Sequence, residues 1–137
     1  MKTPTPHSDI LTLPMHHLID KINNKEISSQ ELLEIQLEHI SKHNPSINSV
    51  VTIDEELALK KTIEADNALT KGESWGPLHG LPITLKDAYE VKGIPSTGGS
   101  SKWKTHIPAK NAVVADRLQQ AGAIVYSKTN VTELSRD

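Results

Sequence analysis

The fold of this chain is decided by the stretch Gly76-Pro77-Leu78-His79-Gly80-Leu81-Pro82-Ile83-Thr84-Leu85-Lys86-Asp87. Turn residues open the stretch, and the alternation that follows predicts a strand from Leu81 to Lys86. Leu81, Ile83 and Leu85 face one side of this strand. Lys86, its last residue, faces the other side, at a point where a core begins. Burial disfavours the charged form of a lysine, and a neutral lysine is a base. The alternative is a strand-end lysine whose ammonium group reaches water.

The chain reads as two parts of a single domain, a mainly helical layer in residues 1–72 and the start of a sheet in residues 73–137. In the second part, a helix at 112–120 separates the strand that ends at Lys86 from a second apolar strand at 123–126. A helix between two strands is typical of a crossover connection. The sequence therefore predicts an α/β fold with a parallel or mixed sheet.

Capping boxes mark the helices of the first part. Ser28 with Glu31 predicts the start of one helix, which Pro45 is expected to end. Thr52 with Glu55 predicts the start of the next helix. Helices therefore precede the strands of the sheet along the chain.

Composition excludes several classes of function. Lys and Arg total 15 against 17 Asp and Glu, a net charge of -2, so no nucleic-acid partner is expected. The chain has no cysteine, which excludes a disulfide framework, a cysteine-ligated zinc site and a thiol nucleophile in this stretch. Met1 to Asp9 lack the pattern of a signal peptide, and no segment has the ~20 apolar residues of a membrane span. We expect a soluble, cytoplasmic protein with no membrane partner.

Three blocks of the sequence carry a family resemblance. The blocks are His79-Gly80-Leu81-Pro82-Ile83-Thr84-Leu85-Lys86-Asp87, Gly93-Ile94-Pro95-Ser96-Thr97-Gly98-Gly99-Ser100 and Ala121-Gly122-Ala123-Ile124-Val125-Tyr126-Ser127-Lys128-Thr129-Asn130-Val131-Thr132-Glu133-Leu134. In this order and spacing they closely resemble the amidase signature family. The resemblance implies a layered α/β/α fold with a mixed sheet, of which this chain holds the N-terminal part.

The resemblance also implies a catalytic role for one lysine. The family uses a Ser–cis-Ser–Lys triad, and by position its lysine is Lys86. In its neutral form Lys86 would take a proton that the middle serine relays from the nucleophilic serine, and would return protons to the leaving amine. This is the logic of acyl transfer with lysine in place of histidine. Both serines are expected beyond Asp137, so the chain alone is expected to be inactive, and neither cofactor nor metal is implied.

The other polar residues near Lys86 in the sequence are not predicted to be catalytic. Ser100 and Ser101 follow two glycines, as in the family's serine segment, but lack the further glycines and the helix that form an oxyanion hole, so neither is expected to be the nucleophile. Asp87 faces away from Lys86 along the strand and is expected to be structural. Residues 128–130 end the second strand at the same edge as Lys86 and are expected at most to support the site.

The function that this resemblance implies is hydrolysis of a small-molecule carboxylic amide to an acid and an amine. The first alternative, in the same family, is the A-type subunit of an amidotransferase for tRNA-dependent amidation. Segments 96–100 and 129–134 look more like the stand-alone amidases. The second alternative is a non-catalytic fragment or binding module, since this stretch offers no credible nucleophile. The sequence indicates neither which amide is bound nor an oligomeric state.

Overall fold

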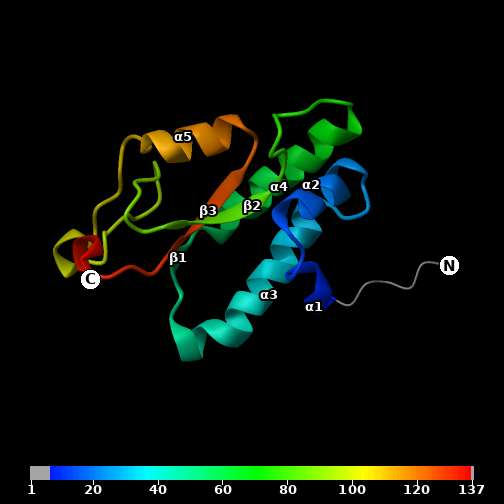
Figure 1. Ribbon diagram of the computed structural model, residues 1–137. Helices are drawn as coiled ribbons and strands as arrows, with labels where there is room; N and C mark the ends of the chain where they lie inside the picture. The colour runs from blue at the N-terminus through cyan, green and yellow to red at the C-terminus, as the bar shows by residue number, and fades with distance from the viewer. Residues whose placement is uncertain (1–6, 137) are drawn as a thin grey trace.

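Regular elements make up most of the computed structural model, which describes residues 7–136 (Figure 1). Residues 1–6, part of the stretch in which no signal peptide is expected, lie outside the described residues, as does Asp137. The elements in chain order are α1 His7–Ile10, α2 Met15–Asn23, α3 Ser29–Ile47, β1 Val50–Ile53, α4 Glu55–Thr70, β2 Pro82–Lys86, η1 Ser101–Trp103, α5 Val113–Gln120, β3 Ile124–Thr129 and η2 Glu133–Ser135, where η marks a 3-10 helix.

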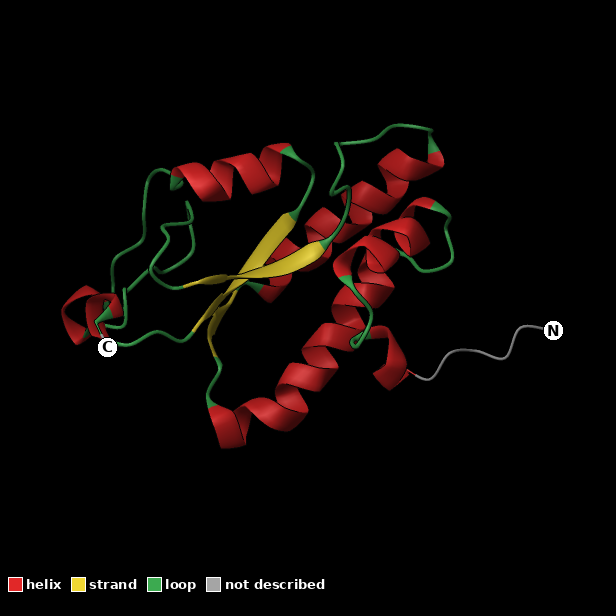
Figure 2. Cartoon of the chain, viewed as in Figure 1, coloured by secondary structure: helices red, strands yellow, loops and turns green. Residues whose placement is uncertain are grey.

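The described strands form a mixed sheet in the order β1-β3-β2. β2 runs parallel to β3 and β1 runs antiparallel to it, so β3 is the central strand. Helix α5 lies on one face of the sheet, and α3 and α4 lie on the other (Figures 1 and 2). The predicted α/β/α layering and mixed sheet are therefore confirmed.

Each face of the sheet has its own apolar core. On the α5 face, Val125 and Leu85 pack with Ala115 of α5 and with two buried residues of the loop that follows β2, Val91 and Ile94. On the opposite face, Tyr126 packs with Leu33 of α3 and Ala58 of α4. Side chains of neighbouring β3 residues thus enter different cores, as the pleat of a strand requires.

The capping box at the start of α3 is confirmed, but its predicted end before Pro45 is wrong. Helix α3 continues through Pro45 to Ile47, and Asn48 ends it with a left-handed φ of 48°. A proline this close to the end of a helix removes one backbone hydrogen bond and leaves the rest in place. The Asn44 side chain also bonds both the N–H and the C=O of Val50, at 2.9 and 2.8 Å, which ties the helix end to β1.

The predicted capping box of α4 is wrong as well. Asp54, rather than Thr52, caps the helix, and its Oδ1 accepts a 3.0 Å hydrogen bond from the N–H of Leu57. Thr52 instead pairs with Lys128 in the sheet. Pairing with β3 therefore extends β1 beyond the residue whose hydroxyl the sequence pattern assigned to the helix.

Tyr126 makes the fold sensitive to alkaline pH. The residue is 1% exposed, its hydroxyl donates to Gln36 Oε1 at 2.9 Å, and burial raises its pKa to about 12 from 10. Above pH 10 the unfolded chain releases this proton and the folded chain retains it, so stability is lost as the pH rises towards the folded-state pKa. We expect this tyrosine to lower the free energy of unfolding by about 1.3 kcal/mol between about pH 9 and about pH 11.

Denaturant unfolding of the wild type and of Tyr126→Phe at the two pH values isolates this effect. The phenylalanine variant cannot titrate, so its stability should change less with pH than that of the wild type. Loss of the bond to the half-buried Gln36 lowers stability by about 1 kcal/mol at both pH values and cancels in the comparison. An equal pH dependence in the two proteins would contradict the assignment.

Candidate active site

Lys86 lies where two parallel strands end. It is the last residue of β2 and pairs with Thr129, the last residue of β3. Leu85 packs into the core on the α5 face, and because side chains alternate along a strand, Lys86 points to the other face. The Lys86 side chain is exposed there, at the edge of the sheet where α/β proteins build their ligand sites.

The buried lysine at this edge is Lys128 rather than Lys86. Lys128 is 0% exposed and Lys86 is exposed, so within the described residues Lys86 is the strand-end lysine whose ammonium group reaches water, the alternative that the sequence left open. The reason lies in the order of the strands. β3 has a neighbour on both sides, whereas β2 is an edge strand of the described sheet. The sequence held one signal for this, a lysine two residues after the apolar run 123–126 of a central strand.

Three acceptors surround the Lys128 ammonium group. Its Nζ donates to Asp87 Oδ1 at 3.2 Å, to Ser96 Oγ at 2.9 Å and to the carbonyl oxygen of Tyr89. An ammonium group has three N–H donors, so all of them are used. Burial lowers the pKa of Lys128, and the Asp87 carboxylate opposes that shift.

Asp87 connects the ends of β2 and β3 to the glycine-rich loop formed by residues 92–101. Its side chain is buried, and its carboxylate accepts hydrogen bonds from the N–H of Thr97, at 3.1 and 3.2 Å, and from the Thr97 hydroxyl. Its own N–H donates to the carbonyl oxygen of Thr129 at 3.0 Å, and its carbonyl oxygen accepts from Gly98 at 3.1 Å. This agrees with the structural role expected for Asp87.

Ser100 and Ser101 of the glycine-rich loop make no hydrogen bond to a lysine or a histidine within the described residues. The Ser100 hydroxyl is buried and donates to the Glu133 carboxylate at 2.9 Å, so within the described residues it meets neither lysine nor histidine. Ser101 is exposed at the start of η1. Gly99 has a φ of +73° and lies so close to Val131 that an added Cβ would come within 2.5 Å of its carbonyl oxygen. The loop is thus a packed structural turn.

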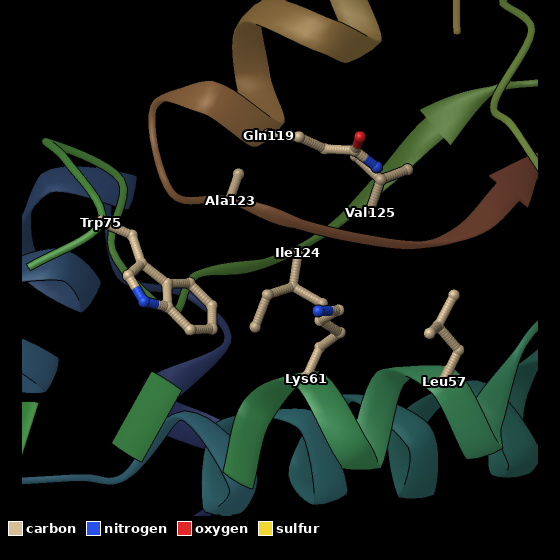
Figure 3. Close-up of a pocket in the computed structure, with 7 residues that line it drawn as sticks. All are labelled: Leu57, Lys61, Trp75, Gln119, Ala123, Ile124 and Val125. Carbon is tan, nitrogen blue, oxygen red and sulfur yellow. The ribbon is translucent and has the colours of Figure 1, made fainter. Parts of the chain in front are cut away.

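A groove at the other end of β3 is separate from Lys86. It has a volume of about 330 Å³ and lies between α4, α5 and the first half of β3 (Figure 3). Its lining residues are Leu57, Lys61, Trp75, Gln119, Ala123, Ile124 and Val125. Since Ile124 begins β3 and Lys86 pairs with its end, the groove is not part of the lysine site.

The described residues show neither a membrane-spanning element nor a metal cluster. Across residues 7–136, no helix combines the length and apolar character needed to cross a membrane. In the same range, no three His, Asp or Glu side chains are grouped to hold a metal ion.

The sequence matches a family model described as Amidase over residues 31–136. Among curated proteins, the chain is 35% identical over 127 residues to the A-type subunit of the glutamyl-tRNA(Gln) amidotransferase of Carboxydothermus hydrogenoformans, covering 93% of this chain and 26% of that protein. It is 38% identical over 112 residues to an acylamidase of Rhodococcus erythropolis, covering 82% of this chain and 24% of that protein. The chain spans about a quarter of the length of these curated relatives.

Solved structures show the same likeness. A peptide amidase from Stenotrophomonas maltophilia superposes with a TM-score of 0.83 at 29% identity, covering 95% of this chain and 26% of that one. A fatty acid amide hydrolase superposes with a TM-score of 0.84 at 29% identity, covering 93% of this chain and 23% of that one. Both are similar to this chain over nearly its whole length.

Proposed function

The chain belongs to the amidase signature family, and from that premise we propose that the protein containing it hydrolyses a carboxylic amide to an acid and an amine. Lys86 is its proton-accepting base. The proposal draws on the family resemblance and on the position of Lys86 at the carboxyl end of β2, where its side chain is exposed. Both serines of the triad then come from sequence beyond Asp137.

The observation that carries the choice of Lys86 is the contrast between two lysines near the carboxyl ends of the neighbouring parallel strands β2 and β3. All three donors of Lys128 are used in hydrogen bonds, two of them to the buried Asp87 and Ser96, so this residue is poorly suited to exchange protons with a substrate. Among residues 7–136, the Lys86 side chain makes no hydrogen bond or ion pair. Lys86 is therefore the lysine available to meet a serine from another segment.

The proposed reaction follows the logic of acyl transfer. The nucleophilic serine attacks the amide carbonyl carbon, and its proton passes through the middle serine to the neutral Nζ of Lys86. The C–N bond breaks and the amine leaves with a proton returned from Lys86. Water then attacks the acyl-serine ester, the carboxylic acid departs and the serine regains its proton. Lys86 ends each cycle in its neutral form.

The A-type subunit of an amidotransferase is the second candidate, supported by the 35% identity to a protein of that kind. Segments 96–100 and 129–134 favour a stand-alone amidase. The two candidates differ in what activity requires. A stand-alone amidase releases amine or ammonia from simple amides by itself, whereas an amidotransferase component needs its partner chains. Assaying the complete protein alone on aliphatic, aromatic and peptide amides separates them.

We expect residues 1–137 expressed alone to release no ammonia from simple primary amides, because the two serines of the triad, from which Lys86 would accept a proton, are then missing. The complete protein should be active in the same assay. Ser100→Ala and Ser101→Ala in the complete protein should keep kcat within about threefold, since neither hydroxyl bonds to a lysine or histidine and the Ser100 hydroxyl is held by Glu133 in the packed loop. Hydrolysis by the short chain that disappears with Ser100→Ala would make the loop serine the nucleophile, and would make a non-catalytic role for this segment untenable as well.

A further inference from the structure

We infer that Lys128 is a positioning residue that holds Lys86 in place for proton transfer, acting through Asp87 and the backbone of Tyr89. The inference rests on the proposed function, because it assigns Lys128 a role in the chemistry of Lys86. It goes beyond that function in naming the group that fixes the base. Lys128 pairs with Leu85, so it shares the α5 side of the sheet with that residue and lies on the side opposite to the Lys86 side chain.

The first observation is where the contacts of Lys128 fall. Two of its three acceptors, the Asp87 carboxylate and the Tyr89 carbonyl oxygen, belong to the turn that begins at Lys86. The N–H of Tyr89 also donates to the carbonyl oxygen of Lys86 at 3.0 Å, which closes that turn. The Lys128 ammonium group therefore bonds to two residues of the turn, Asp87 and Tyr89, and limits the directions in which Lys86 can point.

The second observation is that the same cation anchors the loop next to the turn. Ser96 accepts the third bond of Lys128, and its hydroxyl donates in turn to the carbonyl oxygen of Ile94 at 3.1 Å. Thr97 completes the connection by donating to Asp87 through its N–H and its hydroxyl. The strand end and the loop thus form one hydrogen-bonded unit whose centre is a buried ion pair.

The third observation concerns energy. Removing two charges from water is costly, and a buried ion pair can often be replaced by apolar groups with little loss of stability or with a gain. Stability alone is thus a weak reason for a Lys128–Asp87 pair that is 0% and 1% exposed. A satisfied buried network does impose one geometry on the groups it joins. A base needs such geometry, since a displacement of about 1 Å can lower a rate about a hundredfold.

The test uses the complete protein and compares activity with thermal stability. Lys128→Met leaves the Asp87 carboxylate buried without its cation, so both Tm and kcat should fall. Adding Asp87→Asn removes the second charge and keeps acceptor and donor atoms for Thr97. We expect the double variant to recover most of the lost Tm while its kcat stays about tenfold or more below the wild type. Its KM should stay within about twofold, because substrate binding does not use this network.

Lys21→Met is the matched control, since it removes a partly exposed lysine from a surface ion pair with Glu26, 2.9 Å long. It should leave kcat and Tm close to the wild type, as single surface pairs contribute little. If neither Lys128→Met nor the double variant with Asp87→Asn folds, Ser96→Ala is the variant to be measured. It removes one acceptor of Lys128 and should lower kcat severalfold at unchanged KM.

Recovery of kcat together with Tm in the double variant would show that the network acts through stability alone and would overturn the inference. An unchanged kcat in Ser96→Ala, or a change in KM instead of kcat, would do the same. Lys86→Ala is assayed in parallel. If Lys86→Ala stays active, the proposed base is wrong. If it is inactive while kcat recovers in the double variant, Lys86 remains the base and only the role of Lys128 is rejected.

Discussion

Replacing Lys86 by arginine in the complete protein should lower kcat/KM for amide hydrolysis by about a thousandfold or more, nearly as much as replacing it by alanine. Arginine keeps the positive charge and much of the bulk, but it does not lose its proton in a protein. A role as a base therefore fails with arginine, whereas a role as a cation survives. Steady-state kinetics on a reactive simple amide measure the difference.

The fold should tolerate both changes at Lys86. Its side chain is exposed and unpaired among the described residues, and Leu85 continues to pack on the α5 face. Tm is expected to change little. Lys60→Arg, at another exposed lysine, on α4, is the control for the arginine substitution and should leave kcat/KM unaltered. Turnover by Lys86→Arg within a few-fold of the wild type would reduce Lys86 to a charge or a packing group.

Gly122→Ala should destabilise the fold by about 3–5 kcal/mol, the sum of backbone strain and overpacking. Gly122 has a φ of +99°, and a Cβ there would lie 2.9 Å from the backbone N and Cα of His79. The opposing backbone cannot easily move away. Gly80 donates to the carbonyl oxygen of Gly122 at 2.9 Å, and the His79 ring is held by the N–H of Trp75 and the carbonyl oxygen of Ala65.

Gly72→Ala separates steric contact from backbone strain. Gly72 also has a positive φ, +78°, but no atom lies within 4 Å of a Cβ added there. Its substitution should destabilise the fold by about 1–2 kcal/mol, the strain of a left-handed residue alone. Denaturant unfolding measures both variants. Equal losses at the two positions would show that the close approach of the turn before β2 to the turn before β3 contributes nothing.

The elements that local sequence predicted correctly are those with signals contained in a few neighbouring residues. Ser28 and Glu31 form both bonds of the predicted capping box, at 3.0 and 2.8 Å, because both partners lie in one turn of helix. The helix expected at 112–120 is α5, and the lysine strand is β2. Thr52 was misassigned because a competing partner, β3, lies far away in sequence.

The ends of the two parallel strands show where local pattern was insufficient. The apolar run at 123–126 and the strand end at 128–130 agree with β3, which ends at Thr129, where both β1 and β2 pair with it. The local pattern does not indicate that this strand end lies beside Asp87. The ion pair of Lys128 and Asp87, 41 positions apart, has no local signal in either strand.

By itself, the sequence determined the class of fold, the family and the position of Lys86 at the end of a strand. These follow from alternation, capping and the spacing of three blocks, which are properties of the chain read in order. Only the tertiary structure decided which lysine is buried. Burial depends on how many neighbours a strand acquires, and Lys128 sits on a central strand while Lys86 sits on an edge strand of the described sheet. A residue's solvent exposure is thus set by segments distant in sequence, which the order of residues around it does not reveal.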